Sequence, residues 1–173
     1  MIVTGGISPN KAGWVGPFAA KLTNDNELAQ HKVVTQAVYD ENDGNTKICM
    51  QILHTGRYVM HPFLVAPSPL KAPINPFTPF EMFPSLIKST IQDYVNCAVL
   101  AKEAGYDGVE IMGSEGYLIH QFLSQKTNIR EDEWGGEDFT NRMKFAIEIV
   151  KQTKAAVGDD FIIIYCLCML DLM

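Results

Sequence analysis

Residues 47–54 read KICMQILH, a short segment with apolar side chains on both of its alternating faces. That composition is typical of a strand inside a parallel sheet that is covered on both sides. A helical pattern follows at about residues 85–104 with Gly105 as its stop, and a second apolar strand comes at residues 107–112. Strand, helix and strand in this order predict a right-handed βαβ unit.

The same alternation continues on both sides of this unit. Residues 1–4 resemble a strand that ends at Gly5 and Gly6, and residues 161–167 resemble another strand. Helical periodicity begins near residue 26, after capping candidates at residues 24–26 and before a stop at Asp43 and Gly44. Another amphipathic helix is predicted over residues 139–157, with Gly158 after it.

A long connection separates the first helix–strand pair from the next helix. Residues 55–84 contain seven prolines and are expected to form an irregular surface loop of a functional kind. Neither GxGxxG after a strand nor GxxxxGK[ST] occurs, so the dinucleotide fingerprint and the P-loop are excluded. We therefore predict an α/β fold, a partial TIM (β/α)8 barrel of about four parallel strands with connecting helices.

Composition excludes several classes of partner. The formal net charge is −6 with no cluster of Lys or Arg, which argues against nucleic acid and anionic membranes. The longest apolar stretch, near FIIIYCLCML, is too short to cross a bilayer, and no leader is recognisable, so we expect a cytoplasmic protein. The cysteines, at positions 49, 97, 166 and 168, lack zinc spacing and are expected to be neutral thiols; no metal site is predicted.

Chemistry in such barrels is carried by loops at the carboxyl ends of the strands. Three stretches lie there: Gly5-Gly6, residues 51–57 and residues 113–117. Tyr117 could be an ordinary core tyrosine at a strand–helix junction or a proton donor. Gln51 could face water, or its amide could hydrogen-bond a ligand, because burying an unpaired amide costs about 1–3 kcal/mol.

Several motifs occur in a common order: GGISP, QILHTGRY, LVAPSPLKAPIN, EAGYDGVEIMGSEGYLI-QFLS, TN-R-D-WGG, NRMKFA and DFIIIY. Together they resemble the FMN-dependent old yellow enzyme superfamily, and within it the bacterial NADPH-dependent 2,4-dienoyl-CoA reductases. The resemblance covers essentially all of residues 1–173 and implies an internal fragment of the FMN-binding barrel domain. Met112 and Glu115 stand where classical ene-reductases carry a carbonyl-binding His and His or Asn, which indicates the dienoyl-CoA branch.

The resemblance implies roles for four residues. Tyr117 would donate the proton that follows hydride transfer from FMN to a conjugated acyl-CoA thioester. Gln51 would contact the flavin ring and Gly6 would allow the backbone to approach it. Lys126 occupies the place of a substrate-contacting arginine, although lysine lacks the planar donor set and could equally be a solvated loop residue.

The remaining polar residues are expected to be structural. Arg130, Asp132 and Trp134 are interpreted as a loop scaffold. Three histidines, at positions 31, 54 and 61, are interpreted as non-catalytic, and His120 as a satisfied helix residue that could otherwise tune Tyr117.

Two departures from the family bear on activity. Cys166 stands where relatives have an arginine aimed at the flavin, and Cys168 where they have a serine. By the resemblance, the first barrel strand, the flavin phosphate site and the parts that bind FAD, NADPH and a 4Fe–4S cluster lie outside this chain. We expect the isolated chain to be inactive; the alternatives are a general ene-reductase acting on small enones, or a truncated, non-catalytic fragment.

Overall fold

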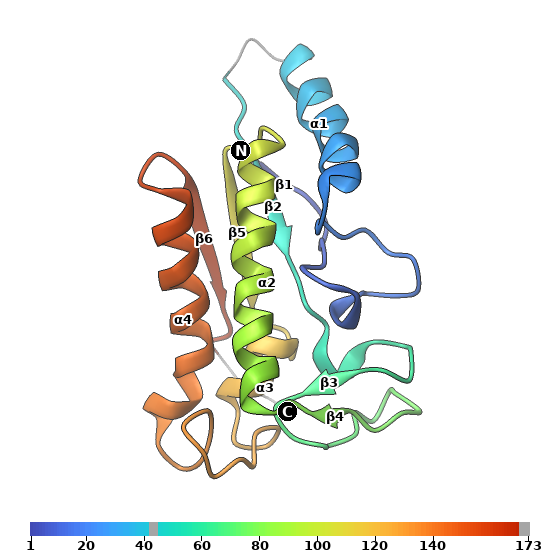
Figure 1. Ribbon diagram of the computed structural model, residues 1–173, viewed down its shortest axis with the longest axis vertical. Helices are drawn as coiled ribbons and strands as arrows, with labels where there is room; N and C mark the ends of the chain where they lie inside the picture. The colour runs from blue at the N-terminus through green and yellow to red at the C-terminus, as the bar shows by residue number, and fades with distance from the viewer. Residues whose placement is uncertain (42–44, 170–173) are drawn as a thin grey trace.

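The computed structural model describes residues 1–41 and 45–169 as a parallel sheet covered by helices (Figure 1). The sheet contains β1 (Ile2–Val3), β2 (Ile48–Ile52), β5 (Gly108–Gly113) and β6 (Ile162–Leu167), in the order β1-β2-β5-β6. Every neighbouring pair in it is parallel. The predicted four-stranded part of a barrel is therefore confirmed.

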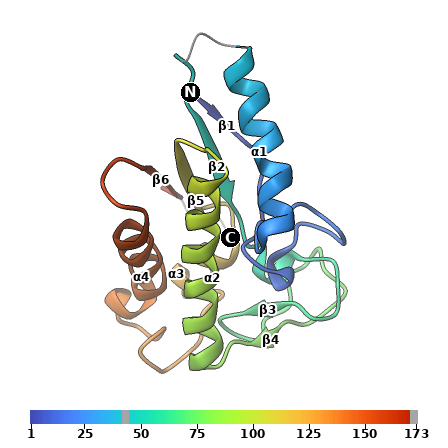
Figure 2. The same ribbon diagram turned by 45° about the horizontal axis from the view of Figure 1, so that its top comes forward.

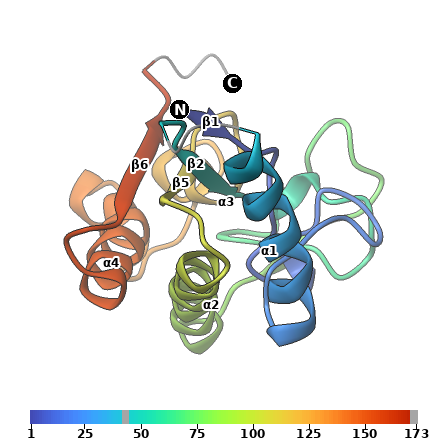
Figure 3. The same cartoon turned by 90° about the horizontal axis from the view of Figure 1, so that it is seen from above.

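Three long helices cover one face of this sheet, as the view from above shows (Figure 3). They are α1 (Asp25–Asp40), α2 (Pro84–Glu103) and α4 (Phe139–Val157), and the short α3 (Leu118–Leu123) follows β5. The Asn24 side chain caps α1 by accepting hydrogen bonds from the backbone amides of Asn26 and Glu27. Gly158 ends α4 with a φ of 80°. The predicted stop at Asp43 and Gly44 lies outside the described residues.

The two faces of the sheet differ in chemistry. Met50, Ile52, Val109 and Ile111 point toward the helices and are fully buried there. Successive side chains of a strand point to opposite faces. The alternate positions therefore form a second face, which carries Gln51, Glu110, Met112 and Cys166; the core lies between the first face and the helices.

One connection differs from the sequence-based prediction. The proline-rich segment is not irregular throughout, because β3 (Val65–Ala66) and β4 (Phe80–Glu81) pair as a small parallel sheet below the strand ends (Figure 1). The predicted end of the first strand at Gly5-Gly6 is confirmed, because β1 does not extend beyond Val3. After the two glycines, Ile7 forms an isolated bridge with Ile52, and the segment from Val3 to Ile7 has one residue more than the facing part of β2. Short 3-10 turns occupy Lys11–Gly13 and Gly56–Tyr58.

The cysteines are all free thiols, as expected. Burial raises the pKa of Cys49, Cys97 and Cys166, which keeps these thiols neutral. Within the described part of the chain, none of the helices has the length and apolar character that a membrane span requires.

Arg130 holds the proline-rich connection against the segment before α4. Its guanidinium donates to the carbonyl oxygens of Pro67 (2.9 Å) and Met82 (2.7 Å), and it binds the Asp132 carboxylate through two nitrogens. The side chain is only 4% exposed, whereas its partners Glu81 and Asp132 are 51% and 37% exposed. The expected loop scaffold is thus confirmed for Arg130 and Asp132.

Replacing this guanidinium should destabilise the fold. We expect Arg130→Met to lower the free energy of unfolding by about 2–4 kcal/mol, because two buried carbonyls lose charge-assisted bonds. Urea unfolding followed by circular dichroism measures this change. Lys144→Met is the control, because its ion pair with Glu133 lies at the surface, where water screens it and it contributes little to stability. Equal losses in the two variants would contradict the role of Arg130.

Candidate active site

The candidate site lies where the carboxyl ends of β1, β2 and β5 meet. Because these strands are parallel, the loops that follow them emerge at one edge of the sheet, on the side of α3, β3 and β4 (Figure 2). The β2 loop contains residues 53–58, and the β5 loop contains residues 114–117. Leu118 N–H donates to the carbonyl of His54 at 2.9 Å, which joins the two loops directly.

A tight turn places Tyr117 at this edge. Tyr117 N–H donates to the Ser114 carbonyl at 3.3 Å across Glu115 (φ 61°) and Gly116 (φ 75°). Positive φ at both central positions is the signature of a type I′ turn. Gly113 closes the strand before it, where a Cβ would lie 2.4 Å from the Tyr165 ring and so cannot fit. The two glycines therefore serve the turn and the close packing that present Tyr117.

The Tyr117 side chain is half-buried against a second tyrosine. Its ring meets Tyr58 edge to face, with centroids 6.1 Å apart and an interplanar angle of 82°. A Cβ on Gly116 would lie 2.7 Å from the Tyr58 hydroxyl, so only glycine allows this approach. Burial raises the pKa of Tyr117, and the negative charge of nearby Glu115 raises it further, followed by the electrostatic effect of Tyr58. The phenol is consequently protonated at neutral pH and can act as a proton donor, not as a base.

Gln51 and Gly6 are brought together on neighbouring strands. Gln51 Nε2 donates to Glu110 Oε1 at 2.7 Å across the β2–β5 pair, in which the two residues are in register. A Cβ on Gly6 would lie 3.3 Å from Gln51 Oε1 and 3.0 Å from Leu53. The missing side chain of Gly6 thus leaves the amide oxygen of Gln51 open on that side.

Glu110 is a residue of this site that the sequence did not single out. It lies on the same face as Cys166, and after burial its charge is the next largest factor that raises the pKa of the Cys166 thiol. Alternating polarity in a strand can indicate an inward-facing carboxylate. Its pairing with Gln51 depends on strand register, which a single sequence does not give.

Lys126 lies apart from Gln51, Gly6 and Glu110 in the sequence, in the segment after α3. It lies exposed in the turn after α3, and its side chain makes no hydrogen bond or ion pair within residues 1–41 and 45–169. Its predicted contact with substrate stays a prediction.

The histidines have structural partners. Burial lowers the pKa of His54 to about 3, and its Nδ1 accepts from Gly56 N–H at 3.1 Å. His31 Nδ1 lies 2.9 Å from the Tyr106 hydroxyl, and His61 accepts from Phe63 N–H. His120 Nδ1 accepts from Gly116 N–H at 2.8 Å. No group of three or more potential metal ligands occurs among the described residues.

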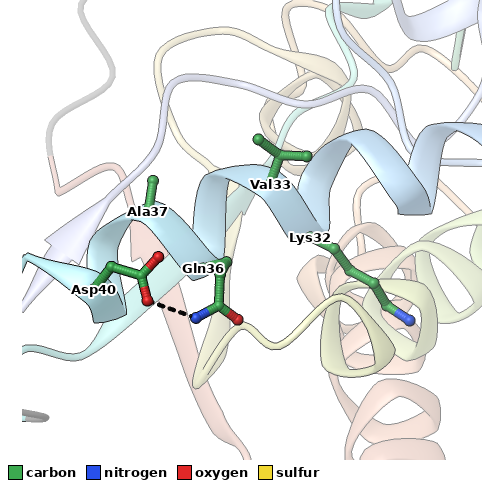
Figure 4. A pocket seen from close by; sticks show the side chains of 5 residues that line it. All are labelled: Lys32, Val33, Gln36, Ala37 and Asp40. Carbon is green, nitrogen blue, oxygen red and sulfur yellow. Dashed lines mark hydrogen bonds between the residues drawn. The ribbon is translucent and has the colours of Figure 1, made fainter.

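Two surface hollows border the helices and lie away from the carboxyl ends of β1, β2 and β5. One, of about 470 Å³, is lined by a single side of α1, where Gln36 donates to Asp40 at 2.7 Å (Figure 4). The other, of about 520 Å³, is an apolar groove between α4 and β6 that contains Phe139, Met143 and Tyr165. Neither contains a residue of the candidate site.

The chain matches a known protein family over its whole length. The sequence profile of the NADH:flavin oxidoreductase / NADH oxidase family matches residues 1–173. The chain is 39% identical over 148 residues to an NADH oxidase of Thermoanaerobacter brockii, covering 82% of this chain and 22% of that protein.

Solved structures agree with this match. A 2-naphthoyl-CoA reductase in complex with 2-naphthoyl-CoA has a TM-score of 0.88 at 31% identity, over 95% of this chain and 27% of that one. Morphinone reductase has a TM-score of 0.87 at 25% identity, over 95% of this chain and 48% of that one. The chain thus spans between about a quarter and a half of the length of the proteins it matches.

The charge of Glu115 should be measurable at the neighbouring phenol. We expect Glu115→Gln to lower the Tyr117 pKa, because the phenolate no longer faces a negative charge. Titration of ring-labelled tyrosine by NMR, with Tyr117→Phe to assign the signal, measures this pKa. Glu131→Gln, which neutralises another exposed carboxylate, should leave it unchanged. A Tyr117 pKa that does not fall in Glu115→Gln would show that the two groups are not coupled.

Proposed function

Because the chain belongs to the NADH:flavin oxidoreductase / NADH oxidase family of FMN-dependent oxidoreductases, we propose that it forms part of an enzyme that reduces a conjugated C=C bond. The proposed substrate is an acyl-CoA thioester of the 2,4-dienoyl type. Tyr117 is the proposed proton donor, Gln51 and Gly6 the proposed flavin contacts, and Lys126 a proposed substrate contact. The observation that carries this proposal is a protonated phenol at the same strand ends as Gln51 and Gly6.

Gln51 and Gly6 fit a flavin ring by their chemistry. The Gln51 amide offers both a donor and an acceptor, as the edge of an isoalloxazine requires, and its oxygen is open beside Gly6. A side chain on Gly6 would fill that space. When bound, FMN would supply the hydride for the reduction. In this chain, Gln51 would hydrogen-bond the edge of the flavin ring, and Gly6 would allow the neighbouring backbone to lie close to that ring.

Tyr117 suits the proton that completes such a reduction. Its raised pKa keeps the phenol protonated, so the proton is available when a carbanion develops on the substrate. The ring packs edge to face against Tyr58, which restricts the movement of the side chain. The proposed proton donor is therefore the hydroxyl group of Tyr117.

The choice of an acyl-CoA substrate is supported by two features. Met112 and Glu115 offer no neutral hydrogen-bond donor of the kind that would hold a small enone carbonyl. A similar solved structure is described as a complex with 2-naphthoyl-CoA. The exposed ammonium group of Lys126 is suited to a CoA phosphate. Reduction of small enones is the second candidate, and the similarity to morphinone reductase favours it.

The role of Tyr117 can be tested in the oxidative half-reaction, in which the substrate reoxidises the reduced flavin. In the complete, FMN-loaded enzyme of which this chain is proposed to form part, we expect Tyr117→Phe to slow reoxidation of the dithionite-reduced flavin by 2,4-dienoyl-CoA by about 10²–10⁴-fold, because the proton donor is lost. Stopped-flow absorbance of the flavin measures the rate, and 2-cyclohexenone as an alternative oxidant distinguishes the two substrate classes. Tyr58→Phe keeps the ring contact and should retain most activity. An unchanged rate in Tyr117→Phe would remove Tyr117 from the reaction.

Flavin affinity should respond to charge at position 166. We expect Cys166→Arg to tighten FMN binding about 10–100-fold, because a charged donor contributes about 1.5–3 kcal/mol. Quenching of FMN fluorescence measures the dissociation constant. Cys166→Met, which adds bulk without charge, should give no such gain. Equal affinities in both variants would show that the missing cation does not limit binding.

A further inference from the structure

Two adjacent side chains of α3 hold the peptide groups that carry Tyr117. Gly116 N–H donates to His120 Nδ1 at 2.8 Å, and the Gly116 carbonyl accepts from Gln121 Nε2 at 2.7 Å. His120 and Gln121 are 5% and 0% exposed, so these bonds are shielded from water. Gln121 N–H also donates to the Tyr117 carbonyl at 2.8 Å. The backbone on both sides of the Tyr117 amide is therefore fixed.

Gln121 also reaches the opposite loop. Its Nε2 donates to the Thr55 carbonyl and its Oε1 accepts from Arg57 N–H, each at 3.1 Å. Gly56 lies between these two residues with a φ of 60°, and a Cβ there would come within 2.2 Å of Gln121 Oε1. The side-chain amide of Gln121 thus joins the loop after β2 to the turn after β5 through both its donor and its acceptor atoms.

This bridge sets the position of Tyr117 relative to Tyr58. Tyr58 follows Arg57, whose amide is bound by Gln121, and Tyr117 follows Gly116, whose carbonyl is bound by the same side chain. We propose that Gln121 is a positioning residue that fixes the Tyr117 phenol against the loop after β2. The use of that phenol as a proton donor rests on the proposed function, whereas its placement does not.

The chain offers a matched control for removing Gln121. Asn128 is another buried amide, 2% exposed, whose Nδ2 donates to the carbonyls of Phe122 and Trp134, each at 2.8 Å. Its Oδ1 accepts from Arg130 N–H at 3.3 Å. Asn128 thus makes the same set of backbone bonds as Gln121 without binding Gly116 or the loop after β2. An apolar replacement at either position leaves two carbonyls and one amide unpaired.

The test compares Gln121→Met with Asn128→Leu by NMR titration of ring-labelled tyrosine, which requires neither flavin nor substrate. We expect both variants to lower the melting temperature, but only Gln121→Met to move the Tyr117 pKa toward about 10, the value of a free tyrosine. Should Gln121→Met fail to fold, Gln121→Asn, whose shorter side chain cannot span both loops, replaces it. An unmoved pKa in the Gln121 variant, or an equal shift in Asn128→Leu, would overturn the proposal.

A kinetic measurement separates this inference from the proposed function. In the complete, FMN-loaded enzyme, Gln121→Met should reduce the turnover number for dienoyl-CoA by about 10–100-fold with less effect on KM, because the proton donor is misplaced. If Tyr117→Phe retains full activity while Gln121→Met still moves the Tyr117 pKa, the proton-donor role fails and the positioning role stands. If Tyr117→Phe is inactive and Gln121→Met keeps both the parent pKa and full turnover, the positioning role fails.

Discussion

The register between β2 and β5 is the constraint on which the site depends. It places Gln51 opposite Glu110 and Ile52 opposite Ile111, so one face of the pair is polar and the other is packed against the helices. A shift of β2 by one residue would turn Gln51 into the core and move Ile52 out of it. Burial of the apolar set therefore fixes where the polar set lies. The same register brings the loops after both strands close enough for Gln121 to bridge them.

The electrostatics of the site favour neutral acids. Glu110 influences the Cys166 thiol, and Glu115 influences the Tyr117 phenol; in both cases the carboxylate raises the pKa of its neighbour. Burial acts in the same direction, because it penalises the charged form of each group. A site arranged in this way stores protons on oxygen and sulfur at neutral pH. This suits a step that consumes a proton, and it disfavours any step that needs a thiolate or a phenolate as nucleophile.

The sequence predicts the regular elements of this fold because their signals are local. Residues 139–157 combine a helical period with a capping aspartate before and a glycine after, and α4 has those bounds. The pairing of β3 with β4 has no such signal. Both strands have two residues, and their alignment depends on Arg130, which binds the carbonyls of Pro67 and Met82 from a distant segment. Propensity cannot indicate a strand that a remote side chain holds in place.

The candidate site was predictable to a similar extent. Tyr117, Gln51 and Gly6 follow from motifs, and the structure places all three at the ends of parallel strands. Gln121 lies in the QFLS motif, but the motif does not indicate its bonds, because a glutamine in a short amphipathic helix resembles a solvated side chain. Its importance arises from two glycines distant in sequence, Gly56 and Gly116, that leave room for one amide between them.

The turn that carries Tyr117 combines strain with a specific charge. A left-handed conformation costs a non-glycine residue about 1–2 kcal/mol, and Glu115 adopts it with a φ of 61°. A glycine would avoid this cost but would remove the carboxylate that raises the Tyr117 pKa. The bonds from His120 and Gln121 to Gly116 each contribute about 1 kcal/mol, which is enough to offset the strain. The turn can therefore keep a charged residue beside the phenol because the following helix stabilises its backbone.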